Sequence, residues 1–203
     1  MNKLLIIGII ILTIILLTFG WKMVKSKNDP GIESYPYKVI SKDDKVEIRQ
    51  YEPALFTSVK LSGNEYSEES SNGFRVLAGY IFGDNAENEK IAMTSPVSMS
   101  LEDSMEMMFM VPAEYKKEDL PVPTDKNIKF IEQPAKVMAA ISFGGWSNDD
   151  KIEKYQKELT NHLDEINIKY TDRFYFYGYN APYEVINRRN EVLVELPESY
   201  SKS

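Results

Sequence analysis

The sequence predicts an α+β protein in which one curved, mostly antiparallel sheet carries one packed helix for each of two similar halves. The first observation behind this prediction is an internal repeat, because KVEIRQYEPALFTSVKLSG and IKFIEQPAKVMAAISFGG superpose with a shift of 81 residues. The second is a helical pattern after each repeat, and the third is a pair of extended runs after each helical pattern. A strand–strand–helix–strand–strand unit that occurs twice most simply forms one sheet.

The two repeats are expected to supply the first strand pair of each half, and a helix should follow each of them. In the first half, apolar residues recur at positions i, i+3, i+4 and i+7 and the pattern ends at Gly83; these residues are Phe74, Leu77, Ala78 and Ile81. In the second half, Ser147 and Asn148 are N-cap candidates. The apolar stripe that follows them consists of Ile152, Tyr155, Leu159, Leu163 and Ile166.

Two extended runs follow each helix, and they are rich in the β-branched, aromatic and methionine side chains that a pleated surface accommodates well. The runs are Met93–Val97 and Met105–Val111 in the first half, and Phe174–Tyr179 and Glu191–Leu196 in the second. The proline-rich segment Leu120–Asp125 connects the halves. We therefore expect one duplicated domain over residues 35–197, followed by a tail at residues 198–203.

An uncharged apolar segment precedes this domain. Residues 4–21 number 18, of which 14 are Leu, Ile, Phe or Trp, and such a segment is just long enough to cross a bilayer as a helix. We expect residues 1–21 to form a single-pass transmembrane anchor and residues 22–34 to form a flexible stalk. The alternative is a cleaved signal peptide, although no small-x-small cleavage site follows the segment. Lysines flank it on both sides, so the side on which the domain lies stays open.

Composition excludes several classes of function. The chain has no cysteine and one histidine, His162, which leaves no material for a disulfide scaffold, a thiolate nucleophile or a multi-histidine zinc site. The net charge is -7. Because residues 1–34 carry a small positive excess, the remainder is more acidic still, and it would repel phosphate backbones. We therefore expect no nucleic-acid partner.

Signals for catalysis are scarce. The sequence lacks a G-x-S-x-G elbow, a P-loop and a G-x-G-x-x-G turn, so we expect no enzyme and no catalytic residue. Gly144-Gly145 lies between a predicted strand and a predicted helix, where anion-binding turns occur. The bulk of Trp146 and the charges of Asp149 and Asp150 favour a plain turn there.

Two clusters of side chains are compatible with a flat apolar ligand. Six methionines lie within 18 residues, and their thioethers suit core packing, pocket lining or a copper site; they are Met93, Met99, Met105, Met107, Met108 and Met110. Strand alternation makes both faces of Met105–Val111 apolar, so the second face must meet a helix, a pocket or a partner. The run Phe174–Tyr179 alternates in the same way between phenylalanine on one face and tyrosine on the other.

His162 and two arginines have a structural and a functional interpretation each. His162 lies at the edge of the second apolar stripe, where a half-packed boundary histidine is favoured over an axial ligand to a metal cofactor. Asn187-Arg188-Arg189-Asn190 is most simply an exposed hairpin turn. Its arginines are also suited to contact a ligand carboxylate.

The order and spacing of several short stretches resemble the SOUL haem-binding protein family along nearly all of residues 35–197. These stretches are VEIRQY (46–51), GFRVL (73–77), YIFGDN (80–85), IAMTSPV (91–97), FMVP (109–112), PVP (121–123), FGG (143–145), YNAP (179–182) and RRNEV (188–192). The resemblance implies a distorted, barrel-like antiparallel sheet of about eight strands with two helices, built by internal duplication.

The resemblance also implies non-covalent binding of haem or a related tetrapyrrole on a shallow apolar surface beside the first helix, without dependence on one shared histidine. Carried onto this chain, it assigns cofactor binding to Phe74, Arg75, Leu77, Ala78, Ile81 and Met93. It assigns no metal ligand, and we do not expect folding to require haem. If the iron is ligated at all, a thioether such as that of Met93 or a tyrosinate from Tyr175–Tyr179 is an optional ligand.

We therefore expect a membrane-anchored, non-enzymatic binder of haem or another tetrapyrrole that acts as a buffer or carrier. The second hypothesis is an effector-binding module for another apolar ligand, because the family's fold is shared with bacterial effector-binding domains. The third is an interaction protein with a vestigial pocket, whose acidic surface docks a protein that the sequence does not identify. A saturable Soret band in a haem titration would separate the first hypothesis from the other two.

The anchor makes a direct prediction. Deleting residues 1–28 should give a soluble domain that melts cooperatively, because the apolar segment would hold the protein in the membrane without contributing to the fold. Membrane fractionation of the full chain and thermal melting of the deleted form check this. Release of the full chain from membranes by carbonate or high salt alone would show that no anchor exists.

Overall fold

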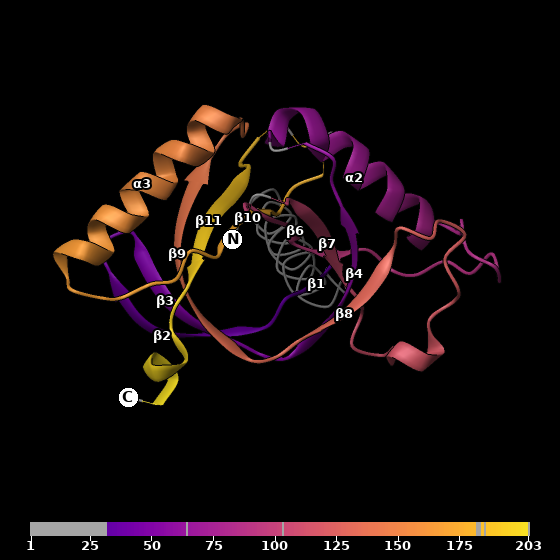
Figure 1. The fold of residues 1–203 in the computed structure, drawn as a ribbon, viewed down its shortest axis with the longest axis horizontal. Helices are drawn as coiled ribbons and strands as arrows, with labels where there is room; N and C mark the ends of the chain where they lie inside the picture. The colour runs from indigo at the N-terminus through magenta and orange to yellow at the C-terminus, as the bar shows by residue number, and fades with distance from the viewer. Residues whose placement is uncertain (1–31, 64, 103, 182–183, 185, 203) are drawn as a thin grey trace, which may run out of the picture. The chain divides into compact units, whose positions relative to one another are not determined.

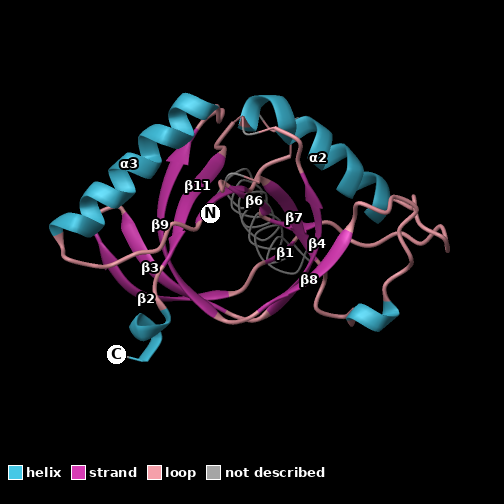
Figure 2. Ribbon diagram, in the orientation of Figure 1, coloured by secondary structure: helices cyan, strands magenta, loops and turns pink. Residues whose placement is uncertain are grey.

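The computed structural model describes residues 32–202, except residues 64, 103, 182–183 and 185. Glu33–Ser203 cluster as one compact unit. Its α-helices in the described part of the chain are α2 (Tyr66–Ile81) and α3 (Asp149–Glu165), and two short 3-10 helices are η1 (Lys117–Asp119) and η2 (Glu198–Lys202) (Figures 1 and 2).

The main sheet curls into a half-barrel of nine antiparallel strands in the order β2-β3-β9-β11-β10-β6-β7-β4-β8. Its strands are β2 (Tyr37–Asp43), β3 (Val46–Tyr51), β4 (Ala54–Lys60), β6 (Val97–Ser100), β7 (Glu106–Met110), β8 (Lys129–Gln133), β9 (Lys136–Gly144), β10 (Phe174–Gly178) and β11 (Arg189–Glu195). The short strands β1 (Glu33–Ser34) and β5 (Thr94–Ser95) pair in parallel. The predicted α+β class, curved antiparallel sheet and two helices are confirmed. The described main sheet has nine strands where about eight were expected, because β2 is added outside the repeats.

The strand order contains the predicted duplication. The first half runs β3-β4-α2-β6-β7 along the chain, and the second runs β8-β9-α3-β10-β11. In the sheet, β10 pairs with its counterpart β6, and the remaining strands follow outward as β11, β9, β3 on one side and β7, β4, β8 on the other. The two halves are therefore related by an approximate twofold arrangement whose centre lies between β6 and β10.

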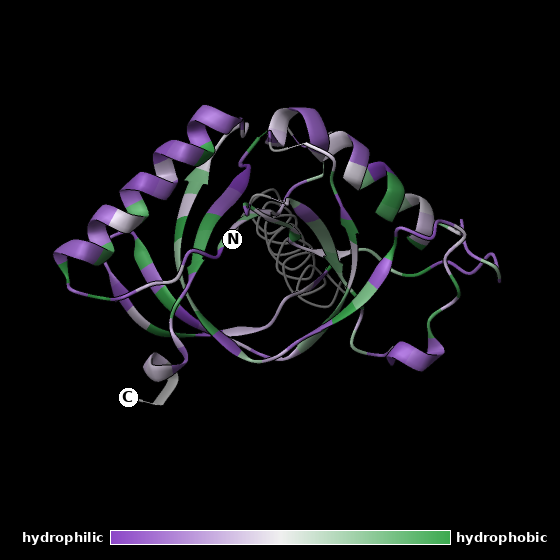
Figure 3. Cartoon of the chain, in the orientation of Figure 1, coloured by the Kyte–Doolittle hydropathy of each residue, from purple (hydrophilic) through white to green (hydrophobic). Residues whose placement is uncertain are grey.

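Both helices pack on the same face of the sheet, each over the strands of its own half. Helix α2 packs against β4 and β7, and α3 packs against β9 and β11. The apolar stripes explain this, because α2 buries Leu77, Ala78 and Ile81 and α3 buries Ile152 and Leu159. Figure 3 shows α3 as predominantly hydrophilic above mainly hydrophobic strands. Asn148, one of the two predicted N-caps of α3, accepts a hydrogen bond from the Lys151 backbone N–H at 3.0 Å.

The strands are apolar on both faces because the sheet has a packed layer on each side. Met107 and Phe109 lie in the core beneath α2, whereas Met108 and Met110 lie on the opposite face. We call that opposite face the tyrosine-rich face; its buried residues are Tyr35, Tyr51, Phe56, Met108, Met110, Met138, Ala140, Tyr175, Tyr177 and Leu193. The predicted alternation along β7 and β10 is confirmed. Of the six methionines, Met93, Met99, Met105 and Met107 thus belong to the core beneath α2, and Met108 and Met110 belong to the opposite face.

The ends of the domain differ from the predicted boundaries. Glu33–Ser34, expected in the stalk, forms β1, and residues 198–202, expected in the tail, form η2. The predicted anchor at residues 4–21 lies outside the described residues. Among the residues that are described, no helix is both long and apolar enough to cross a membrane.

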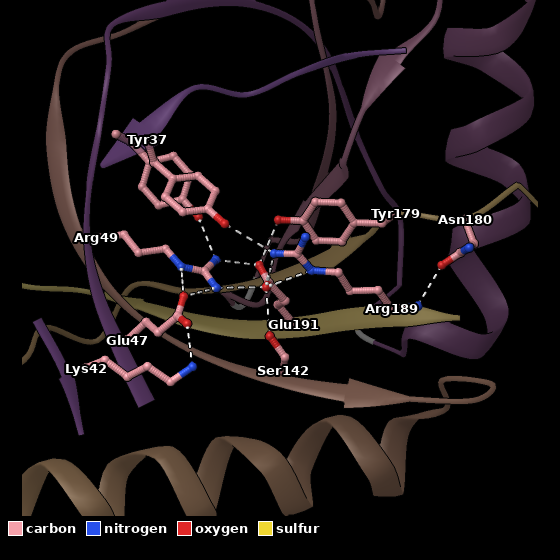
Figure 4. Close-up of polar contacts among 10 residues, drawn as sticks. Tyr37, Lys42, Glu47, Arg49, Ser142, Tyr179, Asn180, Arg189 and Glu191 are labelled. Atoms are coloured by element: carbon pink, nitrogen blue, oxygen red, sulfur yellow. Dashed lines mark hydrogen bonds and ion pairs between the residues drawn. The ribbon is translucent and has the colours of Figure 1, made fainter. Parts of the chain in front are cut away.

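A buried ion pair joins three neighbouring strands on the tyrosine-rich face. The Glu191 side chain on β11 is fully buried, and its carboxylate accepts hydrogen bonds from Arg49 on β3 at 2.8 and 3.0 Å. Ser142 on β9, Arg189 and Tyr179 also donate to this carboxylate, at 2.8, 2.7 and 2.7 Å (Figure 4). Such a group is tolerated in the interior only because every lone pair has a donor.

Glu191 should therefore make stability depend on pH in the acidic range. Burial alone would raise its pKa, but the hydrogen bonds and charge of Arg49, supported by Arg189 and Tyr179, lower it from 4.5 to about 2. In the unfolded chain the carboxyl takes up a proton at higher pH than in the folded one. Its contribution, about 3 kcal/mol, is complete above pH 4.5 and is lost as the pH falls toward 2.

Urea unfolding at several pH values between 6 and 2 checks this prediction. In Glu191→Gln the acid-dependent loss should shrink, and stability at pH 6 should fall by about 3–5 kcal/mol because two arginines lose their carboxylate. Glu195→Gln, two residues along the same strand, is the matched control and should behave like the unmodified chain. Equal pH dependence in the unmodified chain and a folded Glu191→Gln variant would contradict this account.

Candidate functional site

A groove of about 470 Å³ lies on the helix-covered face of the sheet, over the central strands β6 and β10. This volume lies within the range of about 300–1,000 Å³ that small-molecule sites occupy. The first half of α2 forms one wall, and the loops that follow β9 and β10 form the other. The lining residues are Tyr66, Ser67, Ser70, Ser71, Phe74, Val97, Met99, Met107, Trp146, Ser147, Phe176, Gly178, Asn180, Arg188 and Asn190.

The floor of the groove is apolar. Met99 on β6 and Met107 on β7 are register partners, and Phe176 on β10 is the register partner of Met99 on its other side. All three are at least 97% buried. Phe74 projects from α2 as a half-buried ring, 5.4 Å from the ring of Phe109. The floor therefore presents aromatic and thioether surface, which suits the face of a flat apolar molecule.

Gly73 allows α2 to lie close to this floor. A Cβ atom built at Gly73 would come within 2.8 Å of the Leu61 side chain and 3.2 Å of the Met107 side chain. A larger residue would therefore require the Leu61 and Met107 side chains, or α2 itself, to shift. The position of Phe74 over the groove depends on this close approach.

Asp149 joins the two helices beside the groove, through Tyr66 and Ser67, which line it. Helix α2 has no side-chain cap of its own, and the Asp149 carboxylate at the start of α3 accepts from the backbone N–H groups of Tyr66 at 2.6 Å and Ser67 at 3.1 Å. The Ser67 hydroxyl donates to it as well. Burial opposes the charged form, but these hydrogen bonds hold the pKa of Asp149 below its ordinary value. The Ser147 hydroxyl adds a hydrogen bond to the Tyr66 hydroxyl at 2.9 Å.

Arg188 is the only side chain with a formal charge among the described residues that line the groove. Its guanidinium lies 4.1 Å from the centre of the Trp146 ring. One terminal nitrogen donates to the backbone carbonyls of Ala181 at 3.1 Å and Glu184 at 2.5 Å. The Arg188 Nε is buried and has no hydrogen-bond partner within the described part of the chain. A buried N–H without an acceptor is costly, so the site is suited to accept a ligand carboxylate.

The loop between β10 and β11, which carries Arg188, is held by contacts on both faces of the sheet. On the groove face, Asn190 donates to the carbonyl of Gly145 at 2.8 Å, next to Trp146. On the tyrosine-rich face, Arg189 binds Glu191 and its guanidinium lies 4.1 Å from the centre of the Tyr179 ring. The backbone N–H of Arg189 also donates to the Asn180 side chain at 2.6 Å. These contacts fix the direction of Arg188.

The structure places the six residues expected to bind the cofactor in different environments. Phe74 lines the groove. Leu77, Ala78 and Ile81 face the sheet and are at most 7% exposed, so their side chains serve as core. Arg75 is exposed and donates to Asn72 at 3.4 Å. Met93 packs half-buried against the core beneath α2. Contact of these residues with a ligand stays a prediction.

The other candidate residues lie away from the groove or serve as structure. His162 is on the last turn of α3, and its Nε2 is 3.3 Å from an Asp43 carboxylate oxygen. Gly145 has φ +78°, a conformation that favours glycine, and it turns the chain from β9 toward α3. Within the described part of the chain, no group of three or more His, Cys, Asp or Glu side chains is placed to hold a metal ion.

Sequence reasoning missed Trp146 as a site residue. It placed Arg188 in an exposed turn and gave contact with a ligand carboxylate as the alternative role. The two residues are 42 positions apart, and their stacking depends on the pairing of β9 with β11, where Gly144 is the register partner of Arg189. The adjacent glycine pair and an aromatic residue at a strand end were the available signal. Only the strand pairing could show that an arginine would lie against that ring.

Comparison with known proteins identifies relatives along most of the chain. Residues 32–195 match the family described as SOUL heme-binding protein. The chain is 29% identical over 182 residues to Heme-binding protein 1 of Xenopus laevis, covering 84% of this chain and 95% of that protein. It is 30% identical over 185 residues to Heme-binding protein 2 of Homo sapiens, covering 86% and 83%.

Solved structures share the fold at much lower sequence identity. The EcmrR C-terminal domain superposes with a TM-score of 0.58 at 10% identity, covering 79% of this chain and 98% of that domain. A crystal structure described as a hydrolase from Listeria innocua has a TM-score of 0.50, also at 10% identity, covering 78% and 94%. At this identity the likeness concerns the fold alone.

Proposed function

The chain belongs to the SOUL heme-binding protein family, and on this premise we propose that it binds haem or a related tetrapyrrole non-covalently in the groove over β6 and β10. Its role is that of a buffer or carrier that catalyses no reaction. The observation that carries the proposal is the guanidinium of Arg188 above an apolar floor, with a buried Nε–H that has no partner among the residues that the structure describes.

The groove matches the two chemical features of such a ligand. A tetrapyrrole such as haem supplies a flat apolar macrocycle and, on one edge, negatively charged carboxylates. Met99, Met107 and Phe176 provide surface for the macrocycle, whose burial is worth about 25 cal/mol per Å² before the costs of association. Arg188 provides a charge-assisted hydrogen bond to a carboxylate. The hydroxyls of Ser70 and Ser71 on the opposite wall add neutral hydrogen-bonding capacity.

The proposal requires no axial ligand from the protein. No described residue lining the groove is a histidine or a cysteine, and His162 lies at the far end of α3. Tyr175 and Tyr177, which were considered as optional ligands, belong to the tyrosine-rich face. Apolar contact and carboxylate recognition therefore account for binding.

We also propose that residues 4–21 hold the protein in a membrane, which would make it a membrane-anchored binder. The support is the sequence alone, in the form of an uncharged apolar segment of sufficient length followed by polar residues.

A second candidate function is an effector-binding module for another apolar ligand. The fold shared with the EcmrR C-terminal domain is compatible with it, because one fold hosts different ligands. The charge of the ligand separates the two candidates. Because Arg188 lines the groove, the groove should bind an apolar anion more tightly than an apolar cation.

A haem titration of the full chain in detergent, followed by the Soret band, tests the proposed function. Arg188→Gln should weaken binding roughly tenfold, since a hydrogen bond to a charged group contributes about 1.5–3 kcal/mol. Arg188→Lys should retain part of the affinity, because it keeps the charge and loses the planar fork. Arg75→Gln is the matched control and should change affinity less than about twofold, as expected for an exposed side chain.

Melting temperatures of the variants show whether each one is folded. Loss of affinity in Arg75→Gln with an unchanged Arg188→Gln would place the ligand beside Arg75 on α2, one of the residues that the resemblance assigns to binding. Featureless, unsaturable haem uptake by the unmodified chain would contradict the proposed function itself.

A further inference from the structure

Two large apolar side chains are exposed on the loops that follow β9 and β10, which together form one wall of the groove. Trp146, in the loop after β9, is 57% exposed, and Ile186, in the loop after β10, is 75% exposed. Arg188 connects them, because it stacks on Trp146 and binds the carbonyls of Ala181 and Glu184 in the loop that carries Ile186. Exposed aromatic and aliphatic side chains on adjacent loops are typical of surfaces that contact other molecules.

The exposure of Trp146 is fixed by the surrounding structure. The Lys151 ammonium donates to the carbonyls of Gly144 at 2.7 Å and Trp146 at 3.2 Å. The Arg188 guanidinium supports the inner face of the ring. Because backbone and ring are both held, the indole cannot turn inward to bury itself without breaking these contacts.

The N-terminal segment joins the domain at the same end of the sheet. The register pairs Gly178 with Val97 and Asn190, and Arg189 with Gly144, so the loops after β9 and β10 project from the end at which β6 begins. Strand β1, where the described chain starts, pairs with β5 immediately before β6. Residues 22–32 can span at most about 40 Å when extended. An anchor at residues 4–21 would therefore hold strand β1 within about this distance of the bilayer.

We propose that Trp146 and Ile186 dock the mouth of the groove on the surface of the lipid bilayer, so that the tetrapyrrole passes between bilayer and groove. This inference rests on the proposed function for its ligand and on the proposed anchor for its geometry. Tryptophan suits the membrane interface because its ring is apolar and its N–H is polar. Asp149 and Asp150 lie beside the same loop, so apolar insertion, and not attraction to anionic lipid, holds the contact.

Trp21 and Trp146 are the two tryptophans of the protein, so replacing Trp21 leaves Trp146 as the single source of tryptophan fluorescence. The full-length Trp21→Phe chain is reconstituted into phosphatidylcholine vesicles with or without bromine on the acyl chains. Quenching of Trp146 emission by the brominated lipid, with a blue shift relative to the same chain in detergent, is the expected result. Emission that bromine leaves unchanged in vesicle-bound protein, or failure of the chain to sediment with vesicles, would overturn the inference.

A matched pair of variants in the Trp21→Phe chain tests the surface itself. Ile186→Ser should reduce the quenching, because it removes the second contact point. Phe82→Ser removes a side chain that is 60% exposed just beyond the C-terminal end of α2, far from the groove mouth, and should leave the quenching unchanged. Equal effects of the two variants would overturn the assigned surface. Haem titration of the same chain in detergent is independent: quenching without haem binding would keep the docking surface and reject the proposed ligand.

Discussion

The width of a helix relative to the spacing of strands determines where this protein can bind a ligand. A helix with its side chains is about 10–12 Å across, and neighbouring strands are about 4.8 Å apart, so one helix covers about two strands. Here α2 covers β4 and β7, and α3 covers β9 and β11. The central strands β6 and β10 lie between the two covered pairs. Their helix-side residues, Met99 and Phe176, therefore form the floor of a groove.

The two walls of the groove differ in chemistry, although the two halves of the fold are related by approximate symmetry. The wall from the first half is the serine-bearing start of α2, whereas the wall from the second half is a pair of loops that carry Trp146 and Arg188. Asp149 joins the two helices beside the groove by capping α2 from α3. On the other face of the sheet, the ion pair of Arg49 and Glu191 joins β3 to β11. Removing water from this ion pair is unfavourable, and the dense set of donors around Glu191 offsets it. Fold stability and the direction of Arg188 thus depend on the same short segment, residues 188–191.

Periodicity in the sequence was sufficient to predict the helices and strands, but it was not sufficient to predict the residues of the groove. The spacing of Leu77, Ala78 and Ile81 correctly indicated a helix that buries one face, and alternation along β7 correctly divided its methionines between two faces. The same spacing explains why these three residues are buried, because a helix stripe that packs on a sheet turns its side chains toward the strands. Phe74, one turn earlier on the stripe, reaches beyond the covered strands and lines the groove. The contact of Arg188 with Trp146 follows from strand pairing, which local patterns do not encode.

Paramagnetic relaxation measured on backbone amides tests most directly whether the groove is the tetrapyrrole site. Ferric haem broadens the amide signals closest to its iron, and metal-free protoporphyrin serves as the diamagnetic reference. The account predicts the strongest broadening at Ser70, Phe74, Gly178 and Asn190, with sharp signals at His162 and along Lys117–Asp119. Broadening centred on the C-terminal turn of α3, or on the tyrosine-rich face, would contradict it.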